Sequence, residues 1–315
     1  MGDFFTYSVI LGIFVATLKI ATPLLIAATG ELVAESSGIL NLSIEGTMTL
    51  GAFAGFVTAN ETGSLWLGLL GAAAGGGALA LLMAIMTVTV RVNQVVAGLA
   101  LNILGLGAAF FWYRSVYSAG GSIQIPVVDK FEVVSVPLLS SIPIVGEVLF
   151  EQHWLTYIAL LMVPATWMFL NRTKYGLELR AIGHNPEACD MRGVPIASRQ
   201  YAAVIFGGAM AGVGGSFLSL AATGLFFPDI VAGRGWIALA IVIFGNWRAT
   251  WILAGSLLFG FLEATQLALQ ASDVNLPYQL LLALPFVLTI LALVLNRSRS
   301  GAPLSLTIPY HRGER

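Results

Sequence analysis

Long apolar runs, separated by short polar connections, dominate this chain. A helix needs about 20 mostly apolar residues to cross a bilayer, and somewhat fewer when it is broken. On this measure the sequence predicts nine membrane segments, at roughly 5–28, 46–60, 65–90, 94–113, 154–170, 201–222, 236–246, 250–270 and 278–295. The segments 46–60 and 236–246 are too short for ordinary spans. We therefore expect two broken or short helices among the nine segments.

The composition is incompatible with a water-soluble fold. The chain is 57% hydrophobic and 10% charged, whereas soluble domains carry roughly 25% charged residues. A net charge of −1 gives no electrostatic reason to expect a nucleic-acid partner. Cys189 is the only cysteine, which rules out an intrachain disulfide and a cysteine-rich metal site. We expect an all-α, polytopic membrane protein that forms a single domain over residues 1–315 and binds no metal.

Basic residues are divided unequally between the two sides of this arrangement. One side carries eleven, namely Arg91, Arg172, Lys174, Arg180, Arg192, Arg199, Arg248, Arg297, Arg299, Arg312 and Arg315. The other side carries three, Arg114, Lys130 and Arg234, and Lys19 is expected to extend from the first segment toward the cytoplasmic end. Cytoplasmic connections hold the excess of Lys and Arg. The sequence thus predicts a cytoplasmic segment 171–200, a cytoplasmic C-terminus and an external N-terminus.

The longest external connection, residues 114–153, combines acidic residues, prolines and an apolar stretch. Its acids are Asp129, Glu132, Glu147 and Glu151. Two interpretations are equally open: an ordered lid on the outer face of the membrane, or an irregular connector.

The two halves of the chain share the same order of features. The segments 5–28 and 201–222 are the first and the sixth, so they run in opposite directions. Each is followed by a polar, glycine-bearing stretch, 31–46 or 223–235, and then by a short segment. Interrupted segments at corresponding places mark the substrate path of many transporters. We predict an inverted repeat with half-repeats at about 5–113 and 201–295.

Four polar residues are candidates for the substrate pathway. Asn41, Ser43 and Glu45 alternate at the entrance to a short segment, where amide, hydroxyl and carboxylate groups suit a polyhydroxylated ligand. The alternative is that Ser43 or Glu45 merely caps the helix that begins near residue 46. Glu263 lies inside a span, where a charge is costly, so we expect it to be functional or to pair with a basic group across the bundle.

The polar segment 171–200 contains the signals of a very short helix. Asn185 is a good N-cap, and Pro186 suits the first helical position. Glu187 would lie at the positive end of the helix dipole, and Gly193 can adopt the left-handed conformation that ends a helix. About two turns of helix are not stable alone in water. We expect this helix to dock against a partner.

These motifs resemble the permeases of ABC importers in the branched-chain amino acid and simple-sugar superfamily. The resemblance is carried by residues 175–194, 31–56 and 233–247, and it extends from about residue 20 to residue 295. The greatest resemblance is to nucleoside and simple-sugar importer permeases, and the external stretch PLLSSIPIVGEVLF (137–150) also fits this subgroup.

The resemblance implies a set of partners in the bacterial plasma membrane. These are a second permease subunit, two ATP-binding subunits and an extracytoplasmic substrate-binding protein or lipoprotein, and this chain itself would bind no ATP and no other cofactor. The short helix would enter a cleft on an ATP-binding subunit. The implied coupling-loop residues are Arg180, Gly183, Asn185, Pro186, Glu187, Ala188 and Gly193. Cys189 and Asp190 depart from the family pattern, which usually has small or apolar residues there.

Three functions are thus in contention. The first is the permease of an ATP-driven importer for nucleosides or simple sugars, with a branched-chain amino acid importer as its sibling. The second is a free-standing carrier in which Glu45 or Glu263 holds a coupling proton. The third, a membrane enzyme, would need a concentrated catalytic cluster that the sequence does not show.

Overall fold

The computed structural model describes residues 7–119, 122–123, 126–135, 137, 140, 142, 145–271, 287 and 301–310. The helices are α1 (Tyr7–Ser36), α2 (Ile44–Thr62), α3 (Leu65–Ala84), η2 (Ile85–Thr89), α4 (Gln94–Tyr117), α5 (Val145–Leu149), α6 (Trp154–Arg172), α7 (Lys174–His184), α8 (Pro186–Met191), α9 (Ile196–Phe217), η3 (Leu218–Thr223), α10 (Arg234–Phe244) and α11 (Ala249–Ala271). The strands are β1 (Ser118–Ala119), β2 (Ser122–Ile123), β3 (Val133–Ser135) and β4 (Glu151–His153), which pair antiparallel as β1–β2 and β3–β4.

Within the described residues, six helical stretches are long and apolar enough to cross a membrane. They are α1, α3 with η2, α4, α6, α9 with η3, and α11. Helices α2 and α10 lie where the two short segments were predicted; α10 is short, with 11 residues, but α2 has 19 and is longer than expected. The predicted segment 278–295 lies outside the described residues except for position 287. The prediction of a mostly helical, polytopic chain is confirmed, and the count of nine stays a prediction. The expectation of an all-α chain is wrong in one detail, because the 114–153 connection forms two short strand pairs.

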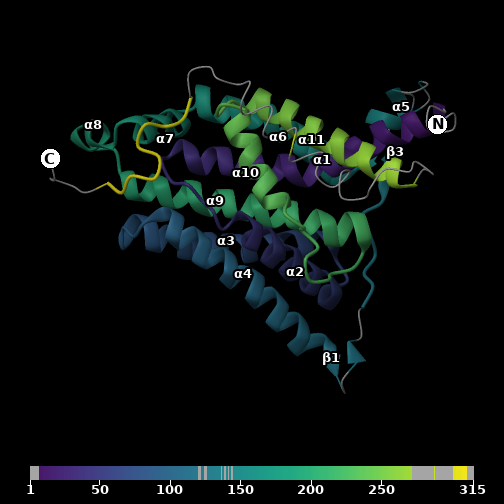
Figure 1. Ribbon diagram of the computed structural model, residues 1–315. Helices are drawn as coiled ribbons and strands as arrows, with labels where there is room; N and C mark the ends of the chain where they lie inside the picture. Colours follow the sequence, from purple (N-terminus) through teal and green to yellow (C-terminus); the bar gives the residue numbers. More distant parts are fainter. Residues whose placement is uncertain are drawn as a thin grey trace.

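The helices form one bundle with two distinct ends (Figure 1). Helices α7 and α8 and the C-terminal residues 301–310 lie at one end, which we call the α8 end. The start of α1, helix α5 and strand β3 lie at the opposite end, which we call the β3 end. The segment 171–200 and residues 301–310 therefore share one end and the start of α1 lies at the other, in agreement with the predicted relative placement.

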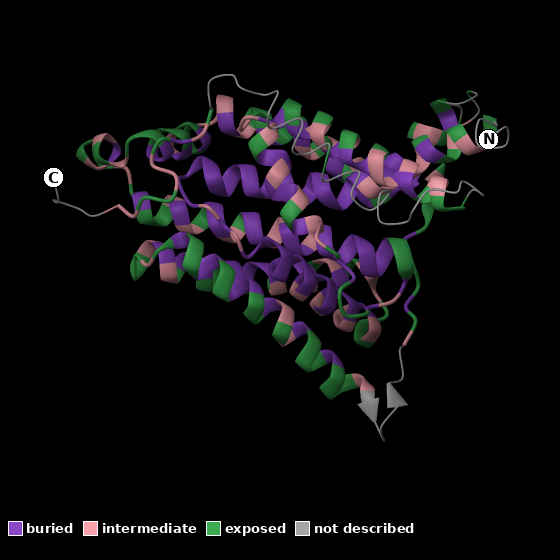
Figure 2. Cartoon of the chain, viewed as in Figure 1, coloured by how far each residue is buried: buried purple, intermediate pink, exposed green. Residues whose placement is uncertain are grey.

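Helices α1 and α9 form the centre of the bundle (Figure 2). Every residue of α1 from Ala21 to Ser36 is buried. By contrast, α4 exposes large apolar side chains such as Ile103 and Phe111 on its outer face. Such a surface would be unfavourable in water but suits contact with lipid or another membrane subunit.

Glycines let the central helices approach backbone to backbone. A Cβ at Gly51 would lie 2.2 Å from the Cα of Gly212, and one at Gly215 would lie 1.9 Å from the carbonyl oxygen of Met48. Neither position has room for a side chain, so α2 and α9 pack in direct contact. Small residues promote this kind of packing between membrane helices.

Helix α1 continues farther than its polar sequence indicates. The stretch from Glu31 onward was expected to interrupt the helix, but α1 ends only at Ser36 and the break covers residues 37–43. The reason is that both acids have partners. Glu31 accepts a hydrogen bond from the backbone N–H of Asn41 at 3.1 Å, and Glu35 accepts one from the indole N–H of Trp247 at 2.5 Å.

The β3 end of the bundle contains Lys19 and the described part of the 114–153 connection. Lys19 does not extend toward the α8 end; it lines a cavity of about 590 Å³ with Lys130 and His153. The described part of the 114–153 connection packs against η3, where the N–H of Phe131 donates to the carbonyl of Leu220 at 3.0 Å. The ring of Phe131 also contacts Trp66 edge to face at 5.3 Å. These contacts favour the ordered lid over the irregular connector.

Candidate functional site

Helices α2 and α10 begin side by side inside the bundle, and Glu45 joins them. Glu45 lies in the first turn of α2, yet its two carboxylate oxygens accept hydrogen bonds from the N–H groups of Gly233 and Gly235, both at 2.7 Å. These N–H groups belong to the start of α10. The first N–H groups of a helix lack partners within it, and its positive end attracts negative charge. A side chain of α2 therefore caps α10.

The start of α2 has a different capping residue from the one expected. Asn102, in the middle of α4, accepts a hydrogen bond from the N–H of Gly46 at 2.6 Å. Ser43 makes no capping bond through its side chain; its hydroxyl donates instead to Asn41 Oδ1 at 2.6 Å. Ser43 and Glu45 do lie at the start of α2, as that interpretation expected, but neither side chain caps this helix. Asn102 was missed because it is distant in sequence and lies inside an apolar run, where no local pattern marks a cap.

The amide group of Asn41 is the polar feature of the junction that points most directly to a ligand. Asn41 is fully buried, and among the described residues its Nδ2 has no hydrogen-bond partner. A buried donor without a partner costs free energy, about 1–3 kcal/mol. The unused donor keeps Asn41 a candidate for contact with a polar solute.

Helices α2 and α10 run from this junction toward opposite ends. Helix α2 leads to the β3 end, where Trp66 at the start of α3 meets Phe131. Helix α10 leads to the α8 end, where Asn246 and Trp247 line a cavity with Arg180 and His184. The α2 and α10 helices are each preceded by a break, 37–43 or 224–233, which contains residues with positive φ such as Gly38 (87°) and Gly233 (85°). Backbone of this kind is tolerated at membrane depth only where protein or a watery cavity satisfies it.

Glu263 is paired across the bundle, as the sequence led us to expect. Its carboxylate forms an ion pair with the guanidinium of Arg234, the first residue of α10. The same guanidinium donates to the carbonyl of Val231 at 3.1 Å. Arg234 therefore belongs to the inner junction rather than to a connection outside the bundle, where its position in the sequence had placed it.

Helix α8 has the caps that the sequence predicts. Asn185 Oδ1 accepts a hydrogen bond from the N–H of Ala188 at 3.0 Å, and Pro186 is the first helical residue. Gly193 adopts a φ of 76° just after the helix. The side chain of Glu187 is exposed, and burial raises the pKa of the Cys189 thiol. The predicted mini-helix is confirmed as a structure; its docking partner stays a prediction.

A second polar helix, α7, was not predicted, and it contains two of the expected coupling residues. Arg180 donates to the side-chain oxygen of Asn171 at 2.7 Å, which holds the corner between α6 and α7. A Cβ at Gly183 would lie 2.4 Å from the carbonyl of Ser36. Helix α7 thus rests directly on the end of α1. The expected coupling residues are divided between α7 and α8.

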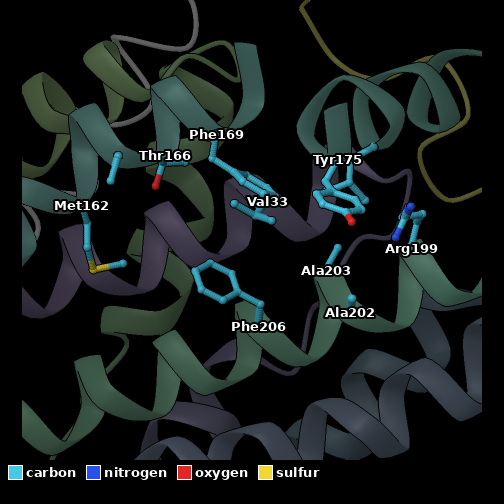
Figure 3. Close-up of a pocket in the computed structure, with 11 residues that line it drawn as sticks. Val33, Met162, Thr166, Phe169, Tyr175, Arg199, Ala202, Ala203 and Phe206 are labelled. Atoms are coloured by element: carbon cyan, nitrogen blue, oxygen red, sulfur yellow. The ribbon is translucent and has the colours of Figure 1, made fainter. Parts of the chain in front are cut away.

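An apolar pocket of about 470 Å³ opens among α1, α6, α7 and α9 (Figure 3). Val33, Met162 and Phe206 line it, and Tyr175 and Arg199 lie at one edge. Arg199 has partners already, since it lies 4.4 Å from the centre of the Tyr175 ring and 2.6 Å from a carboxylate oxygen of Glu178. This apolar lining does not match a polyhydroxylated ligand, so the junction is the better candidate site.

Comparison with known proteins agrees with this architecture. The family described as "Branched-chain amino acid transport system / permease component" matches residues 13–293. A putative glucose ABC transporter permease protein of Haloferax volcanii is 42% identical over 84% of this chain and 81% of its own length. A nucleoside ABC transporter permease protein of Lactococcus lactis is 35% identical over 95% of this chain and 97% of its own. A guanosine ABC transporter permease protein of Bacillus subtilis is 34% identical over 95% of this chain and 96% of its own length. The chain therefore belongs to the family of ABC transporter permeases, and it is a transport subunit rather than an enzyme.

Proposed function

We propose that this chain is the membrane-spanning subunit of an ATP-driven importer for a neutral, polyhydroxylated solute, a nucleoside or a simple sugar. The names of the relatives support this class of substrate, since they include glucose, guanosine and nucleoside transporters. Family membership also favours this function over a free-standing ion-coupled carrier. The chain would lie in the plasma membrane with its N-terminus outside and α8 in the cytoplasm.

The observation that carries the proposal is the capping of α10 by Glu45. Two helices that begin beside each other at mid-bundle and run to opposite ends form the kind of junction around which a transporter alternates its access. Helices α1 and α9, which precede the two breaks, lie together at the centre of the bundle. This arrangement supports an inverted repeat with half-repeats at about 5–113 and 201–295. Asn41, Ser43, Glu45 and Glu263 would border the solute path.

ATP binding and hydrolysis would take place on partner subunits. The ATP-binding subunits would bind the exposed face of α8, which includes Glu187 and Met191. Movement of α8 would reach α1 through the close contact between Gly183 and Ser36. A second permease and an extracytoplasmic binding protein would complete the importer, and ATP would be bound only by the partners.

The family description supports an alternative to a nucleoside or sugar as the substrate, namely a branched-chain amino acid. Uptake into proteoliposomes that contain the complete complex distinguishes the two. Guanosine, adenosine, glucose and leucine should be compared as radiolabelled solutes with and without internal ATP. We expect ATP-dependent uptake of a nucleoside or a sugar. Uptake of leucine alone would reject the proposed substrate class, and uptake that does not depend on ATP would reject the importer.

A charge reversal tests the role of α8 in the same complex. Glu187→Lys places a positive charge at the positive end of α8 and on its exposed face. We expect loss of transport and of co-purification with the ATP-binding subunits, while the protein still inserts into the membrane. Glu61→Lys is the matched control, because it reverses the charge of an exposed residue in the last turn of α2, at the β3 end of the bundle. This variant should bind the ATP-binding subunits normally. Normal uptake by Glu187→Lys would contradict the assigned role.

A further inference from the structure

Residues 301–310, which we call the C-terminal strap, lie across the α8 end (Figure 1). The strap forms hydrogen bonds with three regions that are far apart in sequence. The N–H of Gly301 donates to Asn246 Oδ1 at 2.5 Å, in the turn between α10 and α11. The N–H of Ser305 donates to the carbonyl of Gly183 at 2.9 Å, at the end of α7. The N–H of Thr307 donates to the carbonyl of Gly38 at 3.3 Å, in the break before α2.

Ser305 is the central contact of the strap. Its hydroxyl donates to the carbonyl of Gly183 at 2.7 Å. A Cβ at Gly38 would lie 2.8 Å from the same hydroxyl oxygen, and Gly38 has a φ of 87°. Gly38 must therefore be glycine both for its backbone conformation and to make room for Ser305. This side chain holds the end of α7 against the break between α1 and α2.

Tyr310 connects the strap to α8 itself. Its hydroxyl donates to Asp190 Oδ2 at 3.0 Å. Its ring packs against a small apolar cluster of Ile182, Cys189 and Ile196. Asp190 accepts this hydrogen bond, and Cys189 belongs to the cluster on which Tyr310 packs. The contact with the strap gives each of these residues a local role.

A short helix on a surface transmits movement only if it cannot shift independently of the body beneath it. Helix α8 has six residues, and Cys189 is its only buried residue. So short a helix has little stability of its own. Through the strap, α8 gains a second connection to the bundle, and this connection leads to the break before α2 and to the turn after α10.

We propose that the strap is the transmission element of the transporter, with Ser305 and Tyr310 as positioning residues. The strap binds α8, the end of α7, the α1–α2 break and the α10–α11 turn into one body. A displacement of α8 then reaches both α2 and α10 at once. This inference rests on the proposed function, since it takes α8 as the point where the ATP-driven movement enters.

The test is the ratio of solute transported to ATP hydrolysed by the complete complex in proteoliposomes. The variants are Ser305→Ala and Tyr310→Phe, and Tyr7→Phe at the exposed start of α1 is the matched control. A hydrogen bond to a charged group contributes about 1.5–3 kcal/mol, and the lower limit corresponds to about a tenfold change in an equilibrium; because Tyr310 is only partly buried, we use this lower limit. We expect Tyr310→Phe to lower the transport ratio about five- to tenfold while complex yield and basal ATP hydrolysis stay normal. The control should keep the full ratio.

A double-mutant cycle separates coupling from a merely structural role. Asp190→Asn keeps an acceptor for Tyr310 and should retain most of the ratio, whereas Asp190→Ala should match Tyr310→Phe. For the contribution of the Asp190–Tyr310 hydrogen bond, the double variant, Asp190→Ala with Tyr310→Phe, should be no worse than either single variant, because both remove this same bond. A normal ratio in both Ser305→Ala and Tyr310→Phe would overturn the proposal. So would a loss of transport that parallels loss of complex assembly. Failure of the proposed function would appear instead in the unaltered complex, as transport that does not need ATP.

Discussion

Replacing Glu45 with glutamine is expected to loosen the junction between α2 and α10. The carboxylate accepts two backbone N–H groups, from Gly233 and Gly235, at 2.7 Å each. A hydrogen bond to a charged group contributes about 1.5–3 kcal/mol. Glutamine offers only one acceptor oxygen, so one N–H loses its partner and faces an amide donor. The missing charge at the start of α10 removes roughly a further 0.3–1 kcal/mol. The sum is a loss of about 2–4 kcal/mol for the junction.

Amide hydrogen exchange measures this loss where it occurs. Local opening controls exchange in native proteins, and 2 kcal/mol corresponds to about a 30-fold change in the opening equilibrium. Peptides that cover residues 233–237 should therefore exchange at least ~30-fold faster in Glu45→Gln than in the unaltered protein. Glu61→Gln removes an exposed carboxylate from the same helix and should leave exchange unchanged. Equal protection of residues 233–237 in the two variants would refute the capping of α10 by Glu45.

Three further predictions concern the bundle and α8. Glu263→Gln leaves the guanidinium of Arg234 without its ion-pair partner, and because both side chains are partly exposed we expect a loss of about 1–2 kcal/mol, measured by thermal unfolding in nanodiscs. Gly215→Ala introduces a Cβ only 1.9 Å from a backbone carbonyl oxygen of α2, so it should destabilise the protein by about 1–3 kcal/mol. Gly107→Ala is the control, because a Cβ there would have no atom within 4 Å. Equal melting temperatures of the two variants would contradict this packing. Burial raises the pKa of the Cys189 thiol, so less thiolate is present at a given pH. At pH 8 we therefore expect Cys189 to be alkylated more slowly than a free thiol, and its alkylation rate should increase only at a pH above the ordinary range of thiols. A rate equal to that of a free thiol would contradict its burial.

The features that could be predicted from the sequence are those set by neighbouring residues. The caps of α8 come from residues only a few positions apart, so the local pattern was enough to assign Asn185, Pro186 and Gly193. The apolar runs likewise predicted the long spans, because burial in a bilayer depends mainly on the length and composition of each run. Both kinds of signal are contained in one short window of sequence.

The features that could not be predicted depend on partners distant in sequence. Glu45 was interpreted as a pathway residue or a cap for its own helix, because no nearby residue indicates its partners Gly233 and Gly235. Polarity at Glu31 indicated a break, yet α1 continues because partners from other elements satisfy its acids. Ser305 lies in a C-terminal stretch without any motif, and only the fold brings it to Gly183.

The contact between α8 and an ATP-binding subunit is the central claim, and photo-crosslinking measures it directly. A photoreactive amino acid would replace Glu187 on α8 or, as the control, Val127, which is 75% exposed near the β3 end. We expect irradiation of the complete complex in membranes to give a covalent adduct with the ATP-binding subunit from position 187 and none from position 127. An adduct with that subunit from position 127 but not from position 187 would contradict the account.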